Sequence, residues 1–289
     1  MNGMDTNSSH EGEARHAVIL LHGLCGTPLE LGAIPKALSQ SGYTVSPLEI
    51  PGYSAGQLDP AATPSWESWC EAVDTEITHL YETHDTVSIC GLSMGATLGL
   101  AACAQRTDVL ALVALSPMLR YDGWAIGWYL PLLKIAYRLG FTRWSYKEKD
   151  PFGIRNMEMR RRVARAFEKQ DVSEVGAAAI PARYLNEANK LMKVVRKSLH
   201  EVESDILVVH AIDDETTAPR NSQKILQEVR SGTRKAVWLG DCYHIVTFDN
   251  EREIVTNEAV RFIQKAILNH RHDHTYRRLA QRSSLRDRR

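Results

Sequence analysis

A serine flanked by two glycines is the first group of residues whose chemistry stands out. The stretch Gly91-Leu92-Ser93-Met94-Gly95 fits the pattern G-x-S-x-G, in which the serine acts as a nucleophile on a sharp turn between a strand and a helix. The pattern alone is weak, because small residues also let a strand pack closely against the following helix. The function of Ser93 therefore also has to be judged from the structure predicted for the segments on either side.

The segments around Ser93 are those that such a turn requires. Residues 86–90 (TVSIC) predict a short buried strand, and residues 94–106 predict a helix rich in small side chains. A serine at this corner would project its hydroxyl away from the sheet, and the N–H groups that begin the helix would face a developing anion. The expected chemistry is nucleophilic attack, which needs a base, an orienting acid and a second oxyanion donor.

The sequence contains eleven histidines, and the general base is chosen among them by its place relative to the predicted strands. His244 lies between the last apolar strand and the final helix, at the edge of the sheet where Ser93 is expected. His210 ends an apolar strand and is expected to pack or to shape a turn, and His22 is expected to shape the loop that follows the first strand. We therefore predict that His244 is the general base.

A carboxylate that orients the histidine is expected after the preceding strand, 205–211. Asp213, Asp214 and Glu215 follow it, and spacing alone does not choose between Asp213 and Asp214. These acids could instead cap the helix that opens near residue 219. The loop LLHGLCGTP after the first strand predicts the second oxyanion donor, the N–H of Leu24, opposite the N–H of Met94.

Apolar strands alternate with helical segments along most of the chain. Strands are expected at 16–23, 44–52, 86–90, 108–117, 205–211 and 235–240, with helices that include 28–42, 65–82 and 94–106. This alternation predicts an α/β fold with a mostly parallel sheet of about six strands and helices on both faces.

Residues 118–180 interrupt this alternation. The segment contains three of the six tryptophans, Trp124, Trp128 and Trp144, followed by a basic helix near 157–170. We predict an inserted cap or lid over the site, since ligands bind beyond the carboxyl ends of the strands; the alternative is a satellite subdomain with its own small core. The resulting organisation is a disordered tail at 1–15, a catalytic domain at 16–268 and a basic tail at 269–289.

Composition limits the partners and the compartment. The 289 residues carry a formal net charge of zero, so no overall field favours nucleic acid. No stretch approaches 18 apolar residues, and the polar N-terminus lacks a secretory signal, so we expect no transmembrane segment. The cysteines form no C-x-x-C pair, which favours reduced thiols and a cytoplasmic location; they are Cys25, Cys70, Cys90, Cys103 and Cys242.

The last 21 residues hold seven arginines and two aspartates. Such a tail is typical of a solvated appendage, although it could also contact acidic lipid or nucleic acid. The alternating His270, His272 and His274 could bind a metal, but a fortuitous run is the simpler interpretation, and we expect no metal site.

Four stretches together resemble the α/β-hydrolase superfamily, in particular its bacterial carboxylesterase and monoacylglycerol lipase-like branch. They are VILLHGLCGTP, GLSMGATLGL, ILVVHAIDDETTAP and YHIVTFDNEREIVTNEAVRFI, and the resemblance covers about residues 17–268 apart from the insertion. The resemblance implies an α/β-hydrolase fold without the first antiparallel hairpin of larger members. It also implies a triad of Ser93, His244 and Asp214, the acid that stands five residues before Pro219, with the oxyanion held by Leu24 and Met94.

The chain departs from this family at three places. PGYSAG, with Tyr53 and Ser54, stands where the family often has Pro-Gly-His-Gly, and Ala96 replaces a glycine after the serine turn. The Arg160–Arg162 run matches no specificity of the family. The first departure alters a loop near the pocket, which weakens any transfer of substrate preference.

The expected function is hydrolysis of a small carboxylic ester through an acyl-enzyme, without a cofactor. The aromatic residues of the insertion favour an apolar acyl group. An acyl thioesterase would use the same groups, and a ligand-binding homologue with a vestigial triad is the alternative outside catalysis. The sequence does not indicate an oligomeric state.

Overall fold

The computed structural model describes residues 15–58, 64–127, 135, 137, 139–169 and 172–286. Residues 1–14 of the predicted N-terminal tail and Trp128 of the insertion lie outside this range, as do the side chains of residues 273–286.

The centre of the fold is a six-stranded sheet with the order β10-β9-β4-β3-β1-β2, and every neighbouring pair of its strands is parallel. Within the described residues this sheet contains no antiparallel hairpin. The strands are β1 (His16–Leu21), β2 (Thr44–Pro47), β3 (Thr86–Leu92), β4 (Val109–Leu115), β9 (Asp205–Ala211) and β10 (Arg234–Leu239). Because all six run the same way, the loops after them meet at one edge.

Alternate residues of the strands pack into two separate cores, one on each face of the sheet. Ala17 and Ile19 face a core shared with helices α2 (Trp66–Tyr81), α3 (Met94–Gln105), α6 (Ala182–Ser198) and α7 (Arg220–Glu228). Val18 and Leu20 face a core shared with α1 (Ile34–Gln40) and α8 (Arg252–Arg286). The period of two along a strand produces this division, and it confirms the predicted α/β-hydrolase fold with helices on both faces.

One predicted helix is divided in two. The expected helix at 28–42 consists of a 3-10 turn, η1 (Pro28–Leu31), and of α1, because Gly32 between them adopts a φ of 57°. A Cβ at Gly32 would lie 2.7 Å from the carbonyl oxygen of Thr247, so the chain passes close to the loop that follows β10.

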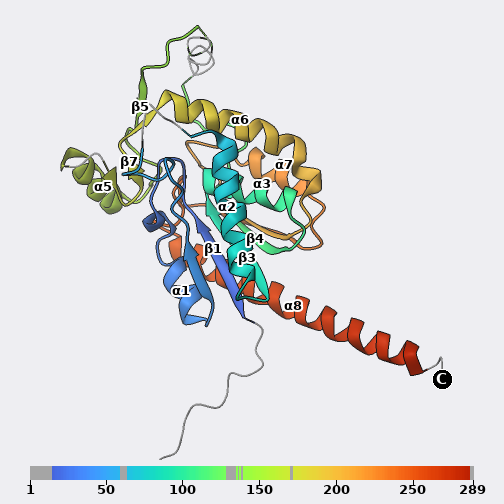
Figure 1. Cartoon of the computed structure of the whole chain (residues 1–289). Helices are drawn as coiled ribbons and strands as arrows, with labels where there is room; N and C mark the ends of the chain where they lie inside the picture. The colour runs from blue at the N-terminus through green and yellow to red at the C-terminus, as the bar shows by residue number, and fades with distance from the viewer. Residues whose placement is uncertain are drawn as a thin grey trace, which may run out of the picture.

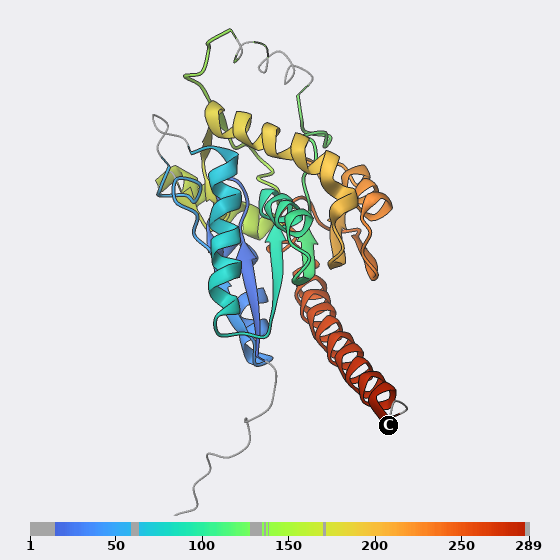
Figure 2. The same cartoon turned by 45° about the vertical axis from the view of Figure 1, so that its right-hand side comes forward.

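The region between β4 and β9 forms a layer over the carboxyl ends of the strands, with α6 crossing above them (Figures 1 and 2). Strand β5 (Ser145–Lys147) pairs antiparallel with β8 (Ala179–Pro181), and β6 (Val172–Ser173) pairs antiparallel with β7 (Gly176–Ala177). The basic segment forms α5 (Met157–Lys169) as expected, and it lies to the left of the sheet in Figure 1. The predicted insertion, 118–180, ends just before α6, which lies in the same layer and packs its apolar side into the core beside the sheet.

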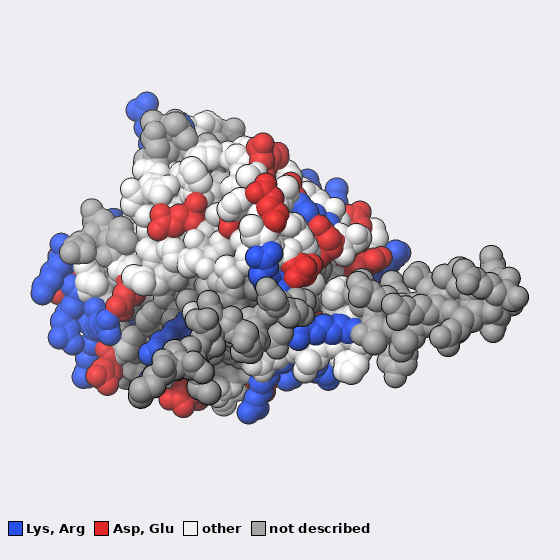
Figure 3. Space-filling model, turned by 60° about the horizontal axis from the view of Figure 1, so that its bottom comes forward, with Lys and Arg blue, Asp and Glu red and all other residues white. Residues whose placement is uncertain are grey.

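The last helix, α8, begins at Arg252 and continues without interruption past residue 268 to Arg286. It leaves the body of the molecule at its far end in both views (Figures 1 and 2). None of the helices in the described part of the chain has the length and apolarity that a bilayer crossing needs. On the face seen in Figure 3, the coloured basic and acidic side chains lie in small groups of both signs.

Candidate active site

Ser93 occupies a strained corner between β3 and α3. Its φ of 57° and ψ of −117° are rare for a residue with a side chain. The corner closes tightly because a Cβ on Gly91 would lie 2.5 Å from the carbonyl carbon of Gly95, and a Cβ on Gly95 would lie 2.2 Å from the carbonyl oxygen of Leu21. The Ser93 N–H donates to the carbonyl of Leu115 at the end of β4, which fixes the corner to the sheet.

Ser93, His244 and Asp214 form one continuous hydrogen-bonded chain. The distance from Ser93 Oγ to His244 Nε2 is 2.8 Å, and that from His244 Nδ1 to Asp214 Oδ2 is also 2.8 Å. The Ser93 hydroxyl also lies 2.9 Å from Met118 Sδ. All three residues are almost fully buried, with Ser93 retaining 7% exposure. The structure thus brings together Ser93 and His244, which the sequence singled out, and Asp214, which the family resemblance implied.

The loop after β9 decides which carboxylate meets His244. Asp214 Oδ1 accepts the N–H groups of Thr216 and Thr217, each at 2.8 Å, so the turn holds this carboxylate toward the interior. Asp213 points outward, where its carboxylate pairs with Arg155 Nη1 at 3.0 Å. The adjacent residues therefore face opposite ways, and Asp214 is the one that reaches His244.

A second histidine also contacts Asp214. His210 Nε2 lies 3.3 Å from Asp214 Oδ2 and 2.8 Å from the carbonyl oxygen of Thr217, so this nitrogen must carry a proton to face two acceptors. His210 is fully buried, and its Nδ1 lies 2.6 Å from Ser222 Oγ. The sequence predicted that His210 packs or shapes a turn; its place four residues before Asp214, at the end of a strand, was the signal for this contact.

These contacts set opposite pKa shifts in the pair. Burial favours the neutral form of His244, but the Asp214 carboxylate outweighs it and raises the pKa of His244 to about 9. Burial likewise opposes ionisation of Asp214, yet His244 and His210 together hold the pKa of Asp214 well below its usual value. Asp214 is therefore an anion that stabilises an imidazolium at His244.

The backbone of His244 is held as firmly as its ring. Its N–H donates to Glu215 Oε2 at 3.1 Å, and its carbonyl accepts from Ser116 Oγ at 2.7 Å. Ser116, directly after β4, has a φ of 43°. These contacts attach the loop after β10 to the loop after β9, its neighbour in the sheet, and to the loop after β4, the next strand beyond β9.

The two predicted oxyanion donors belong to different segments, the loop after β1 and the start of α3. Met94 is the first residue of α3, where an N–H has no partner inside the helix. Leu24 lines the pocket next to Gly23, and within the described residues its N–H donates to no other group. The Leu24 loop is fixed by bonds from the Ala55 N–H to the Gly26 carbonyl and from the Ala177 N–H to the Cys25 carbonyl.

A buried glutamate, Glu30, lies beneath the Leu24 loop and was not identified from the sequence. Glu30 is 3% exposed, and its Oε2 accepts the N–H of Gly23 at 2.7 Å. A Cβ at Gly26 would lie 2.2 Å from Glu30 Oε1, so that glycine makes room for the carboxyl group. Burial raises the pKa of Glu30 to about 8. The only sequence signal was an acid close to two loop glycines.

Tyr53 and Ser54, at which the chain departs from the family pattern, form hydrogen bonds with His22 that stabilise the Leu24 loop. His22 Nδ1 lies 2.8 Å from the carbonyl oxygen of Gly23 and donates to it, so His22 Nε2 accepts the hydroxyl of Ser54 at 2.7 Å. The Tyr53 hydroxyl donates to the His22 carbonyl at 3.1 Å. Burial lowers the pKa of His22 to about 4. His22 therefore shapes the loop as a neutral side chain.

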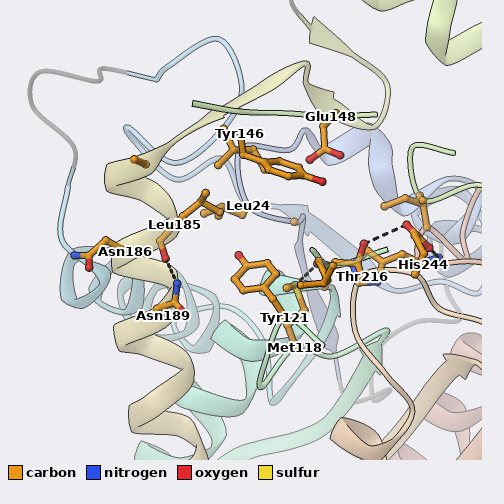
Figure 4. A pocket seen from close by; sticks show the side chains of 18 of the residues that line it. Leu24, Met118, Tyr121, Tyr146, Glu148, Leu185, Asn186, Asn189, Thr216 and His244 are labelled. Atoms are coloured by element: carbon orange, nitrogen blue, oxygen red, sulfur yellow. Dashed lines mark hydrogen bonds between the residues drawn. The ribbon is translucent and has the colours of Figure 1, made fainter. Parts of the chain in front are cut away.

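A cavity of about 550 Å³ opens above Ser93 and His244. Tyr121, Tyr146 and Glu148 point into it, and α6 forms the side opposite His244 (Figure 4). Burial raises the pKa of Glu148 to about 7. The wall contributed by the insertion is mainly apolar and aromatic, and it includes Trp144, Tyr146, Phe152, Phe167, Val175 and Ile180.

The Arg160–Arg162 run of α5 does not line this cavity. Arg160 Nη1 lies 3.4 Å from Asp150 Oδ1, and Arg162 pairs with Glu174. Within the described residues, no group of three or more His, Cys, Asp or Glu side chains is arranged to hold a metal ion.

Comparison with known proteins agrees with this architecture. The family described as serine aminopeptidase, S33, matches residues 12–251. A thermostable monoacylglycerol lipase of Bacillus sp. (strain H-257) is 23% identical over 248 residues, which are 86% of this chain and 90% of the lipase. A carboxylesterase of Bacillus subtilis (strain 168) is 23% identical over 252 residues, 86% of this chain and 92% of the esterase.

Solved structures share the fold. A monoacylglycerol lipase of Paleococcus ferrophilus superimposes with a TM-score of 0.71 at 19% sequence identity, covering 86% of this chain and 94% of the lipase. Since the family match spans most of the chain, the protein belongs to the serine aminopeptidase S33 family of α/β-hydrolases and is related to monoacylglycerol lipases and carboxylesterases.

Proposed function

We propose that the protein hydrolyses carboxylic esters with an apolar acyl group through a Ser-His-Asp triad and an acyl-enzyme. The observation that carries this proposal is the unbroken chain of two 2.8 Å hydrogen bonds from Ser93 through His244 to Asp214, at the base of a cavity. Kinship with monoacylglycerol lipases and carboxylesterases supports the same reaction class.

In this mechanism Ser93 Oγ attacks the acyl carbonyl carbon while its proton passes to His244 Nε2. The carbonyl oxygen becomes an anion that accepts the N–H groups of Leu24 and Met94, each worth about 3 kcal/mol in the transition state. The imidazolium, stabilised by Asp214, then protonates the departing alcohol. Water activated by His244 attacks the acyl-serine, and the acid leaves with Ser93 restored.

The walls of the cavity support the expected substrate. The aromatic side of the insertion offers apolar surface to an acyl chain. We retain residues 118–180 as the cap, residues 269–289 as a basic tail, and a cytoplasmic location on the basis of the five unpaired cysteines.

The first test is labelling with a fluorophosphonate probe, which reacts with activated serines. We expect wild type to be labelled, and Ser93→Ala and His244→Ala to lose labelling and to lower kcat for a neutral ester on the order of 10⁶-fold. Ser198→Ala, at the last residue of α6 and outside the cavity lining, is the matched control. Only the neutral form of His244 can accept the proton of Ser93. Because the pKa of His244 is raised from 6.5 to about 9, the labelling rate should continue to increase between pH 6.5 and pH 9.

The same experiment addresses the alternatives. A folded wild type that resists labelling would contradict the proposal and favour a ligand-binding homologue. An acyl thioesterase would label as well, so matched esters and thioesters with one acyl chain are compared. A kcat/KM more than about tenfold higher on the thioester would move the assignment to that class.

A further inference from the structure

One face of α6 brings a row of polar side chains to the cavity. Five residues separated by one or three positions line it, so they share one side of the helix: Asn186, Asn189, Lys190, Lys193 and Arg196. The opposite side of α6 packs into the core through Ala188, Leu191 and Val195. The helix is therefore oriented by its apolar side, and its polar side is committed to the pocket.

Two of the cations on this face lack a counter-charge. Lys190 pairs with Glu187 at 2.6 Å. Within the described residues, neither Lys193 nor Arg196 forms an ion pair with a carboxylate. Arg196 is half-buried and donates through Nη1 to the carbonyl of Leu119, which leaves its charge uncompensated.

The charges around Arg196 increase this imbalance. Burial lowers the pKa of Arg196, and the nearby charge that adds to the shift belongs to another cation, Arg120. A half-buried cation that is repelled by a second, exposed cation destabilises a fold unless an opposite charge compensates it. An anionic ligand group would supply that compensation.

The carboxyl groups of the cavity lie elsewhere. Glu148 stands across the pocket from Asn186 and Asn189 of α6 (Figure 4), and Glu215 is bonded to the His244 N–H. The cavity therefore has an aromatic wall, a carboxyl side near the triad and a cationic side on α6. An elongated substrate that reaches from Ser93 to α6 would place its far end beside Lys193 and Arg196.

We propose that Lys193 and Arg196 form an anion-binding subsite, so that the preferred substrate carries a carboxylate or phosphate remote from its scissile ester. This inference rests on the proposed hydrolysis at Ser93 and narrows its substrate class. The anion can belong to the alcohol that leaves or to the far end of the acyl chain. Both sources share the same chemistry, a charge-assisted hydrogen bond to lysine and guanidinium groups.

Two matched substrate pairs distinguish these sources. Octanoyl glycerol is compared with octanoyl glycerol 3-phosphate, and methyl octanoate with the monomethyl ester of octanedioic acid, each at low and at high salt. We expect kcat/KM about tenfold higher for the anionic member of one pair at low salt, falling as salt screens the charges. The pair that shows the preference identifies the source.

Variants on α6 test the residues. In Lys193→Gln the ratio of anionic to neutral kcat/KM should fall about threefold, since one partly exposed cation is lost. Lys197→Gln is the matched control, because Lys197 is exposed on the same helix and does not line the cavity; it should keep the wild-type ratio. A wild type that prefers the neutral member of both pairs, or a control that lowers the ratio as much as Lys193→Gln, overturns the proposal.

A binding measurement separates this inference from the proposed function. Ser93→Ala is titrated calorimetrically with octyl phosphate and with octanol. The subsite predicts a Kd about tenfold lower for octyl phosphate, lost in part when Lys193→Gln is added. If no ester is hydrolysed, this result still decides whether the anion subsite exists, and equal affinities for the two ligands contradict it.

Discussion

At the scale of single residues, the carboxylate of Asp214 faces four hydrogen-bond donors. It accepts two backbone N–H groups through Oδ1, while Oδ2 faces both His244 and His210. A carboxylate with four donors keeps its charge and its orientation. His210 forms no hydrogen bond with Ser93 or His244 within the described residues, so its expected role is to position Asp214.

This role predicts how His210 variants behave. His210→Leu removes a donor to a charged group, worth about 1.5–3 kcal/mol, and should lower kcat by roughly 10- to 100-fold with KM little changed. His210→Gln keeps one N–H donor and should recover part of the loss. Steady-state kinetics on a neutral ester, with thermal melts to verify folding, measure both.

The matched control is His16→Gln. His16 is also buried on a strand and bonded to a hydroxyl, that of Thr86, but it lies at the start of β1, far along the strand from the site. It should lose stability without the loss in kcat. A folded His210→Leu variant with wild-type kcat would show that His210 serves packing alone.

At the scale of elements, the turn from β3 to α3 depends on close contact with a neighbouring strand. The backbone of α3 passes so near the end of β1 that a Cβ at Gly95 would lie 2.2 Å from the carbonyl oxygen of Leu21. No side chain can rotate to relieve that contact, because both partners are backbone. The geometry of Ser93 therefore depends on the packing of α3 on β1.

Replacing Gly95 with alanine should displace this turn. We expect Gly95→Ala to destabilise the protein by about 1–3 kcal/mol and to slow fluorophosphonate labelling, since the helix must shift to admit the methyl group. Gly240→Ala provides the comparison, because a Cβ there meets nothing within 4 Å. Denaturant unfolding and labelling rates measure both effects, and equal behaviour of the two variants would contradict the account.

The elements also show how far the sequence could predict the site. The positions of the strands along the chain and of Ser93 and His244 next to them could be predicted, because apolar runs and turn residues are local signals. Spacing could not separate Asp213 from Asp214, since the choice depends on a turn closed by the N–H groups of Thr216 and Thr217. The cations of α6 were missed, because the side of a helix that faces a cavity is set by what the other side packs against.

At the scale of the whole molecule, buried titratable groups tie stability to pH. The pKa of Glu30 is raised to about 8 by burial, whereas in the unfolded chain it lies near 4.5. The folded protein therefore retains a proton that the unfolded chain has released. The stability from this group is fully present below pH 4.5 and is lost as pH rises through 8; His244, with its raised pKa, acts in the same direction above pH 6.5.

The free energy of unfolding should therefore decrease between pH 7 and pH 8. Glu30→Gln keeps an acceptor for the Gly23 N–H but cannot titrate, so the decrease should be smaller by about 1 kcal/mol. Glu71→Gln, on the exposed side of α2, should retain the wild-type slope. Urea unfolding across this range measures both. An unchanged slope in Glu30→Gln would mean that Glu30 is ionised in the folded protein.

The amino-acid sequence by itself determined the parallel α/β architecture, the serine turn and the histidine of the last loop. Each depends on a local pattern: residue periodicity, the glycines on either side of Ser93, or the place of His244 after the last apolar strand. The tertiary structure alone decided that His210 supports Asp214, that Glu30 is buried under the Leu24 loop, and that α6 presents Lys193 and Arg196 to the pocket. These features depend on which surfaces meet when distant segments pack, and such packing leaves no local pattern in the sequence.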